Sequence, residues 1–131
     1  MNLVYLSFPE RLVNQSSLTR RQLETLTSYI RVAVGEIKLR EAASLVSGGR
    51  TKGVPSRPLT TGSYYRTVSQ ARKNVKQGLT TVVIALWLGL IKVEDVRRLF
   101  ELVGGGAREL SDEEAERLVQ VLEALLRRMV V

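Results

Sequence analysis

Two residue types common in catalytic and metal sites are missing: the 131-residue sequence has no cysteine and no histidine. The lack of cysteine excludes disulfides, thiolate metal sites and cysteine nucleophiles. The lack of histidine removes the commonest general base and the commonest transition-metal ligand. We therefore expect neither an enzyme nor a bound metal or cofactor, although catalysis by a carboxylate or a lysine remains open.

Long hydrophobic runs are also missing. The longest uninterrupted apolar stretch, residues 82–91, spans ten residues and includes Gly89, whereas about 20 are needed to cross a bilayer. Residues 1–8 lack the basic region and the small-residue cleavage site of a signal peptide. We therefore expect a cytoplasmic chain that has no membrane partner.

Acidic residues are scarce in one part of the chain. The formal net charge is +7, and residues 38–78 carry nine Lys and Arg against Glu41 alone, a net of +8. With 44% hydrophobic and 25% charged residues, the composition is otherwise that of one folded domain. A basic excess gathered in one block indicates a protein that binds nucleic acid or another acidic surface. The alternative is a solvated basic face without a partner.

Apolar residues recur mostly at helical spacing, which predicts a mainly all-α fold. A capping box formed by Thr19 and Gln22 opens the first clear helix, and Gly35 is expected to end it. A shorter helix is expected over residues 38–46. Residues 47–62 are rich in glycine, proline and basic residues, which predicts a basic loop or a small β-hairpin.

A third helix is expected over about 61–77, capped by Thr60 or Thr61 and interrupted by Gly78. The apolar segment 79–91, which contains Trp87, is expected to lie in the core. A buried strand and a buried helix both fit its composition, and its length favours the helix. The remaining elements are a short strand or extended arm over residues 1–15 and helices over 93–103 and about 111–129.

Residues 18–77 resemble a helix-turn-helix unit. The opening LTRRQLETL resembles the first helix of the tetrahelical family found in sigma-factor promoter-reading domains and response-regulator output domains. The matching residues are Leu18, Thr19, Arg21, Gln22, Glu24 and Leu26. The segments 39–46 and 64–75 resemble the positioning helix and the recognition helix. This resemblance, which covers under half of the chain, implies a transcriptional regulator that binds double-stranded DNA sequence-specifically.

One departure from that family pattern concerns the second connection. Helix-turn-helix proteins join these helices by a turn of roughly three or four residues, whereas about fourteen, residues 47–60, intervene here. Either the unit carries an inserted basic loop or hairpin, or the alignment of its helices is wrong. The composition also suggests an archaeal or thermophilic source.

The third helix has an outward face without acidic residues. The side chains expected to be buried recur at helical spacing and are Tyr64, Val68, Ala71 and Val75. The opposite side carries hydrogen-bond donors of the kinds that contact base edges and phosphates in a major groove. We expect the base-reading residues to be Ser63, Arg66, Thr67, Gln70, Lys73 and Asn74. We expect the phosphate-binding residues to be Arg50, Lys52, Arg57, Tyr65, Lys76 and Gln77.

The last helix carries a regular apolar stripe with the spacing of a coiled-coil seam. We expect this stripe to pair two chains as a homodimer, through Leu118, Leu122, Leu125 and Met129. Residues 1–103 then form a helix-turn-helix DNA-binding domain with an N-terminal arm, and residues 104–131 form a dimerisation helix. The alternative is that the stripe closes the chain's own core over residues 79–91.

The expected partners are therefore double-stranded DNA and a second copy of the chain, with the third helix in the major groove. Two other functions stay open. One is non-specific binding of nucleic acid, by a chromatin-architectural or RNA-binding protein. The other is an interaction adaptor, in which the apolar last helix binds a partner protein and the basic block is incidental.

Overall fold

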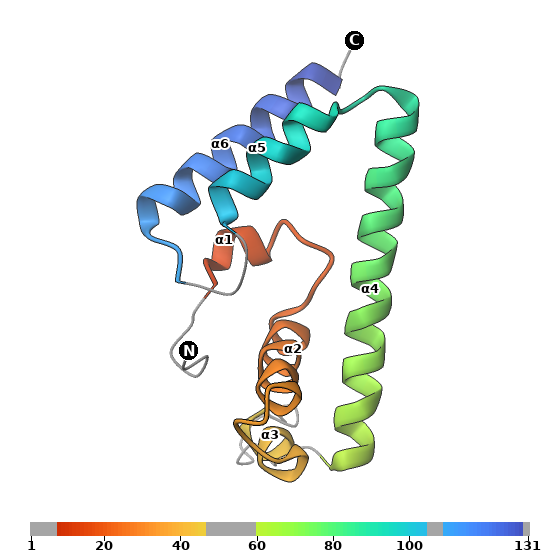
Figure 1. The fold of residues 1–131 in the computed structure, drawn as a ribbon, viewed down its shortest axis with the longest axis vertical. Helices are drawn as coiled ribbons and strands as arrows, with labels where there is room; N and C mark the ends of the chain where they lie inside the picture. Colours follow the sequence, from red (N-terminus) through yellow and green to blue (C-terminus); the bar gives the residue numbers. More distant parts are fainter. Residues whose placement is uncertain (1–7, 47–59, 105–108, 130–131) are drawn as a thin grey trace, which may run out of the picture.

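The computed structural model describes residues 8–46, 60–104 and 109–129. Over these residues the chain forms helices and no strand, which confirms the all-α prediction (Figure 1). The helices are α1 (Glu10–Val13), α2 (Arg20–Ala33), α3 (Leu39–Leu45), α4 (Thr61–Leu88), α5 (Val93–Val103) and α6 (Asp112–Met129).

The helices pack as two groups, each around a core of its own. In the first group, α2, α3 and the first half of α4 surround Ala42, Ala43, Val46, Tyr64 and Val68. In the second group, α1, α5 and α6 surround Leu12, Leu110, Ala115, Leu118 and Val119. Figure 1 shows that α4 runs beside the first group and continues past it, toward the end of the molecule where α5 and α6 lie.

Side-chain caps set the starts of three helices as their spacing predicts. Thr19 and Gln22 bond each other's backbone amides at the start of α2, at 3.1 and 3.0 Å. Ser111 and Glu114 form the same reciprocal pair before α6, with both bonds at 3.1 Å. Of the two candidate caps for α4, Thr60 is the N-cap, because its hydroxyl accepts a hydrogen bond from the Ser63 backbone amide. Each bond satisfies a backbone donor that the helix itself leaves unpaired.

α4 is one continuous helix of 28 residues, so the predicted interruption at Gly78 is wrong. A glycine inside a helix costs only roughly 0.5–1 kcal/mol relative to alanine, and the flanking helical residues outweigh that cost. The helix ends at Gly89, whose φ of 77° lies in the left-handed region that glycine adopts readily.

The segment 79–91 is helical as far as Leu88, as expected, but its predicted burial is wrong. Trp87, expected in the core, has 82% of its surface exposed. Both cores form elsewhere in the molecule, and no described element covers this part of α4. The apolar content of the segment indicates side chains that favour burial, but it could not show whether the same chain supplies a covering element.

The N-terminal segment contains a helical turn, α1, where a strand or extended arm was predicted. Pro9 precedes the turn, and the fixed φ of proline is suited to a helix start. Leu12 and Val13 are buried, which anchors the turn in the molecule. The rest of that predicted element, residues 1–7, lies outside the described residues, as does most of the predicted basic loop or hairpin.

The last helix packs on its own chain. Leu118 and Leu125 are buried, while Leu122 and Met129 lie at the edge of the packed face. The apolar stripe thus serves the chain's own core, as the alternative interpretation had it, but against α1 and α5 instead of residues 79–91. The predicted domain boundary falls between α5 and α6, which pack against each other.

Candidate nucleic-acid interface

Tyr64 fixes how the first half of α4 lies against its core. Its side chain is fully buried, and its hydroxyl lies 2.7 Å from Ser28 Oγ and donates to the Thr25 carbonyl oxygen at 3.3 Å. Burial raises the pKa of the Tyr64 hydroxyl, which therefore keeps its proton. Because Val68 and Ala71 are buried on the same side, one face of α4 is held inward and the opposite face is held outward.

The predicted buried face of α4 is shorter than expected. Tyr64, Val68 and Ala71 are buried as predicted, but Val75 is largely exposed. The last buried residue of α4 is Ala71, and Val75 lies beyond the described core. Only about the first three turns of α4 are therefore held by packing.

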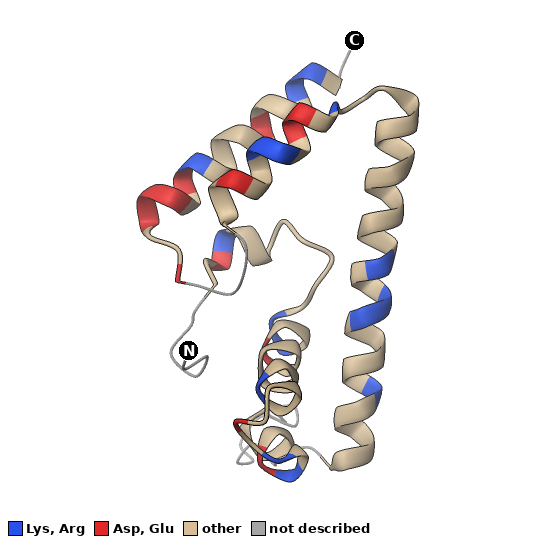
Figure 2. Cartoon of the chain, in the orientation of Figure 1, with Lys and Arg blue, Asp and Glu red and all other residues tan. Residues whose placement is uncertain are grey.

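The outward face of this half of α4 is polar, basic and free of acidic residues. No Asp or Glu occurs anywhere between Thr61 and Leu88. Figure 2 shows the contrast, since α4 carries only basic colouring whereas α5 and α6 carry both signs of charge. The exposed residues opposite Tyr64 are Arg66, Gln70, Lys73 and Gln77. Over the described residues, neither Arg66 nor Lys73 pairs with a carboxylate.

Three of the predicted base-reading residues share this exposed face: Arg66, Gln70 and Lys73. Ser63 and Thr67 are half-buried at its edge, and the Thr67 hydroxyl donates to the Ser63 carbonyl oxygen at 3.0 Å. The hydrogen of that hydroxyl is therefore used within the helix. The structure thus separates a fully exposed subset of the predicted residues from a flanking subset.

Asn74 is turned toward the start of α2. Its amide nitrogen donates to Gln22 Oε1 at 3.0 Å and to the Ser17 carbonyl oxygen at 3.3 Å. Gln22 is also the residue that caps α2, so this contact joins the capped end of α2 to α4. With both donors used inside the chain, Asn74 positions α4 and does not present its amide outward.

The predicted phosphate-binding residues fall into two groups. Those that the structure describes are exposed on α4: Tyr65, Lys76 and Gln77. The other three lie outside the described residues: Arg50, Lys52 and Arg57. The predicted set omitted Arg72, which is exposed one helical turn before Lys76. The spacing of four residues puts these two cations on one side of the helix, and this spacing was the signal that would have identified Arg72.

Several arginines outside α4 are held by carboxylates. Arg31 donates to Glu36 at 3.1 Å just after α2. Arg11 on α1 pairs with Glu116 on α6 at the surface, which joins two helices of the second group. Such pairs neutralise part of the positive charge in the rest of the molecule. α4 itself contains no acidic residue, so no carboxylate of its own helix offsets the positive charge on its outward face.

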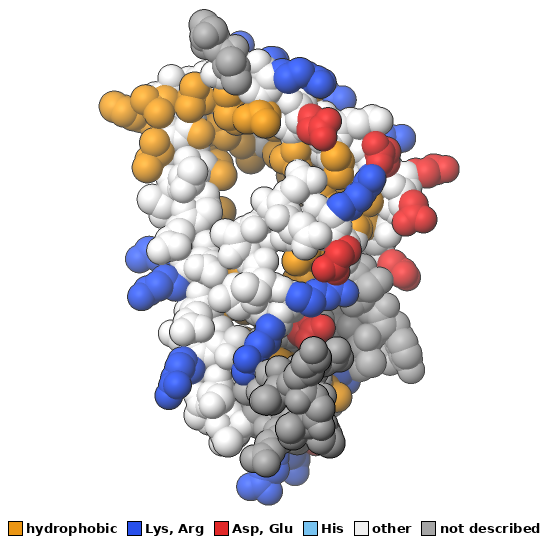
Figure 3. All heavy atoms as spheres, turned by 180° about the vertical axis from the view of Figure 1, so that it is seen from behind, with side chains coloured by type: hydrophobic (Ala, Val, Ile, Leu, Met, Phe, Trp, Pro, Cys, Tyr) orange, Lys and Arg blue, Asp and Glu red, His pale blue; other side chains and the backbone are white. Residues whose placement is uncertain are grey.

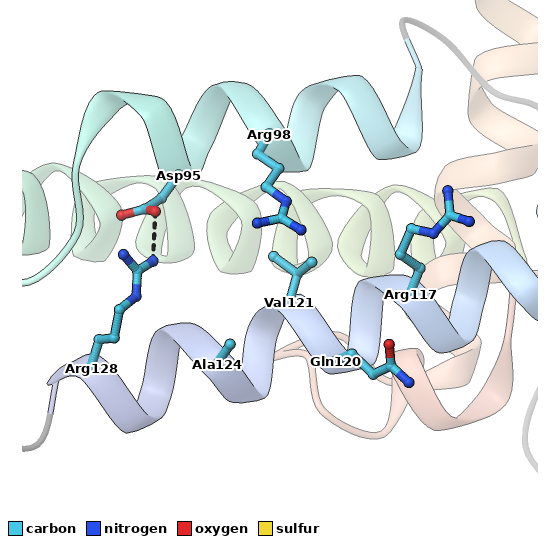
Figure 4. Close-up of a pocket in the computed structure, with 7 residues that line it drawn as sticks. All are labelled: Asp95, Arg98, Arg117, Gln120, Val121, Ala124 and Arg128. Carbon is cyan, nitrogen blue, oxygen red and sulfur yellow. Dashed lines mark hydrogen bonds and ion pairs between the residues drawn. The ribbon is translucent and has the colours of Figure 1, made fainter.

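A shallow groove between α5 and α6 is a second candidate site (Figure 4). Its volume is about 270 Å³, and its lining residues are Asp95, Arg98, Arg117, Gln120, Val121, Ala124 and Arg128. Arg128 donates to Asp95 at 2.6 Å. This hydrogen bond, together with one from the Lys92 backbone amide, lowers the pKa of the Asp95 carboxyl. The groove is small for a ligand site, and part of its charge is already paired internally.

Other functional features are not found in the described part of the chain. No group of three or more metal-ligating side chains occurs among those residues. None of the helices described is long and apolar enough to span a membrane. Comparison with models of known families, with curated proteins and with solved structures finds no match for the chain. The basic face of α4 is thus the feature on which a functional proposal can be built.

Proposed function

We propose that the protein is a sequence-specific DNA-binding regulator of transcription, in which the first half of α4 enters the major groove. The observation that carries this proposal is the acid-free, exposed face on which Arg66, Gln70 and Lys73 lie together. Buried Tyr64 supports it, because a helix held in one orientation presents the same side chains to every duplex. Packing of α2, α3 and α4 around one core also agrees with a helix-turn-helix arrangement.

The chemistry of the three outward residues suits base edges. An α-helix about 10–12 Å across fits a major groove about 12 Å wide. Arginine pairs with guanine through two hydrogen bonds, glutamine pairs with adenine in the same way, and lysine bonds guanine or phosphate. Arg66 and Lys73 are seven residues apart, or roughly 10 Å along the helix, which corresponds to about three base pairs.

The neighbouring side of α4 suits the phosphate backbone. Arg72 and Lys76 lie one turn apart, and Tyr65 is exposed nearby on the helix. Contacts of these types fix how a protein sits on a duplex without distinguishing one sequence from another. In the proposed interface, one side of α4 therefore recognises the base sequence and the neighbouring side positions the protein on the phosphate backbone.

Two observations favour other functions. The cations Arg72 and Lys76 also suit a non-specific binder of DNA or RNA, in which phosphate contacts supply nearly all of the affinity. The exposed apolar side chains in the second half of α4 suit a protein-interaction adaptor. We rank sequence-specific binding first because Arg66 and Gln70 add two base-reading groups on a face without acids.

Selection from a random duplex pool with the full chain, followed by competition binding at physiological salt, tests the proposal. We expect one duplex to be preferred by roughly 10³-fold or more over unrelated duplexes. Equal binding of all duplexes, or a preference for RNA, would replace the proposal with non-specific binding. Failure to bind any nucleic acid at that salt concentration would favour the adaptor.

A further inference from the structure

The second half of α4 is apolar on all sides and is mostly exposed, with Ala85 and Leu86 partly buried. Its large exposed side chains are Leu79, Val82, Val83, Ile84, Trp87 and Leu88. No charged residue occurs from Leu79 to Ile91. A helix that is hydrophobic all round is normally buried. We therefore expect another surface to pack on this part of α4, and the described chain does not supply one.

α5 extends the same kind of surface. Leu99 and Leu102 pack against the second core, whereas a separate stripe of α5 remains exposed. The residues of that stripe follow each other at helical spacing: Val93, Val96, Phe100 and Val103. Figure 3 shows hydrophobic side chains gathered at this end of the molecule, around an opening between neighbouring elements. We call the exposed side chains of residues 79–90 and the α5 stripe together the apolar end.

The apolar end is large for a surface left in water. At exposures such as 82% for Trp87 and 65% for Phe100, its residues present on the order of 1,000 Å² per chain in total, counted over all sides of α4 and the α5 stripe, whereas the largest apolar patch of a typical monomer is about 300–600 Å². A standard stable interface buries about 800 Å² on each partner. The total is comparable with the area that one stable protein–protein contact needs, and a contact would cover the side of it that faces the partner.

We infer that a second copy of this chain covers the apolar end, so that two α4 helices pair through their second halves with the α5 stripes beside them. A two-fold dimer brings the same patch of each subunit together, so the patch must be complementary to itself. An uncharged apolar surface meets that condition, whereas one that selects a different partner usually carries charges for it.

The distribution of charge supports the same partner. Each chain carries a net charge of +7, so two copies repel each other. The cations of α4 lie between Arg66 and Lys76, and the helix beyond them is uncharged. Contact through the apolar end keeps the two basic faces far apart and minimises this repulsion.

Pairing at this place also has a geometric consequence, which rests on the proposed DNA-binding function. Gln70 and Val83 are thirteen residues apart on α4, or roughly 20 Å at about 1.5 Å per residue. If two α4 helices cross near Val83 in an antiparallel sense, their Gln70 residues lie up to about 40 Å apart. Adjacent half-sites on DNA are about 34–36 Å apart. The crossing would therefore present two base-reading faces to successive turns of one side of a duplex.

Sedimentation equilibrium on the full chain, from about 1 to 100 µM, tests the inference without DNA. We expect a dimer of two 14.6 kDa chains. Val83→Glu, which places a carboxylate in the contact, should weaken dimerisation by at least about 100-fold, because an unpaired charge would be buried. Val34→Glu is the matched control, since Val34 is 62% exposed and Val83 is 63% exposed. The control should dimerise like the wild type.

Circular dichroism of both variants checks that they remain folded, and Trp87→Ala supplies a variant that adds no charge. We expect Trp87→Ala to weaken dimerisation at least about 10-fold, in line with the large contribution of buried tryptophan at interfaces. Wild type that stays monomeric at 100 µM would overturn the inference. Unchanged dimerisation of both Val83→Glu and Trp87→Ala would also overturn it.

The absence of native cysteine allows a direct map of the contact. Single cysteines placed along residues 79–88 are oxidised, and the fraction of cross-linked dimer is measured. Residues near a two-fold axis should cross-link, because a disulfide forms only when the two Cα atoms are within about 7 Å. Val34→Cys should give little dimer, and cross-linking that is no stronger at any position of 79–88 than at Val34 would refute the inferred contact. These outcomes do not depend on DNA, so a dimer without sequence preference would refute only the proposed function.

Discussion

The two halves of α4 differ in what surrounds them, although one unbroken backbone joins them. Residues 61–77 bury Tyr64, Val68 and Ala71 on the first core and hold a basic face outward. Residues 78–88 carry apolar side chains on every side and belong to neither core of the described structure. The first half of α4 thus has one buried face and one face in water, and packing holds it in a single orientation. The second half exposes apolar side chains that a partner could cover.

The comparison also shows how the second half is held helical. An isolated helix shorter than about 12–15 residues is marginal in water, because its first turn is costly to form. In α4 that first turn is already formed by the Thr60 cap and by packing of Tyr64. The second half only extends an existing helix, so it needs no core of its own to stay helical. A rigid apolar end can therefore project from a small folded unit.

The largest effect should come from removing the residue that fixes the first half. Tyr64→Ala deletes a fully buried aromatic ring and its hydroxyl contacts, so we expect the free energy of unfolding to fall by about 3–5 kcal/mol. Trp87→Ala, made in the monomeric Val83→Glu background, should change it by less than about 0.5 kcal/mol, because that ring is exposed. Urea unfolding measures both, and equal losses would contradict the contrast between the two halves.

The next prediction tests whether α6 stabilises the second core or forms the dimer contact. Leu118→Ala opens a cavity in the second core, which should lower the free energy of unfolding by about 2–5 kcal/mol. Its effect on the dimer constant should be small beside that of Val83→Glu. Leu122→Ala, at a more exposed position of the same stripe, is the control and should cost clearly less. Dissociation by Leu118→Ala without loss of stability would restore the last helix as the dimer contact.

A smaller effect should appear in DNA binding. Arg66→Ala and Gln70→Ala should each cost about 1–3 kcal/mol on the preferred duplex and relax discrimination at particular base pairs. Lys76→Ala should instead weaken all duplexes alike and reduce the slope of log affinity against log salt by about one. Arg117→Ala, an exposed arginine on α6, is the control that should change neither quantity. Titrations on a set of single-base variants of the duplex would show whether the two kinds of loss are in fact different.

The smallest effect concerns the Asp95–Arg128 ion pair. The hydrogen bond from Arg128 lowers the pKa of Asp95 below its ordinary value of 3.8. A carboxyl whose pKa is lower in the folded state stabilises the fold above its unfolded pKa, and this contribution is lost as the pH falls through the folded pKa. Asp95→Asn, which keeps an acceptor for the Lys92 amide, should lower stability slightly at pH 7 and not at strongly acidic pH. Thermal unfolding at both pH values measures this, and a loss of equal size in acid would mean that charge is not its cause.

The helix starts could be predicted from the sequence because they depend on neighbours along the chain. The pairs Thr19–Gln22 and Ser111–Glu114 each join residues three positions apart. The continuity of α4 through Gly78 was not predicted, although a glycine weakens a helix by only a small amount, which the helical residues on either side outweigh.

Burial and side-chain direction depend on residues that are distant in the sequence, and these predictions were less successful. Asn74 has the spacing of an outward residue, yet it bonds Gln22, which is 52 positions away. Trp87 lies in the most apolar segment, yet no other element of the described chain lies over it. Apolar periodicity indicates which side chains need cover, but not whether the cover comes from the same chain.

The pairing of the first helix with the last has a consequence for the order of folding. Leu12 belongs to the same core as Leu110 and Val119, and Arg11 pairs with Glu116, 105 positions away. Synthesis proceeds from the N-terminus, so every residue of the first core is made before α6. Leu12 emerges earliest of all but must wait for the last partners to appear. The helices proposed to read DNA therefore close first, and α1 docks only when the end of the described chain arrives.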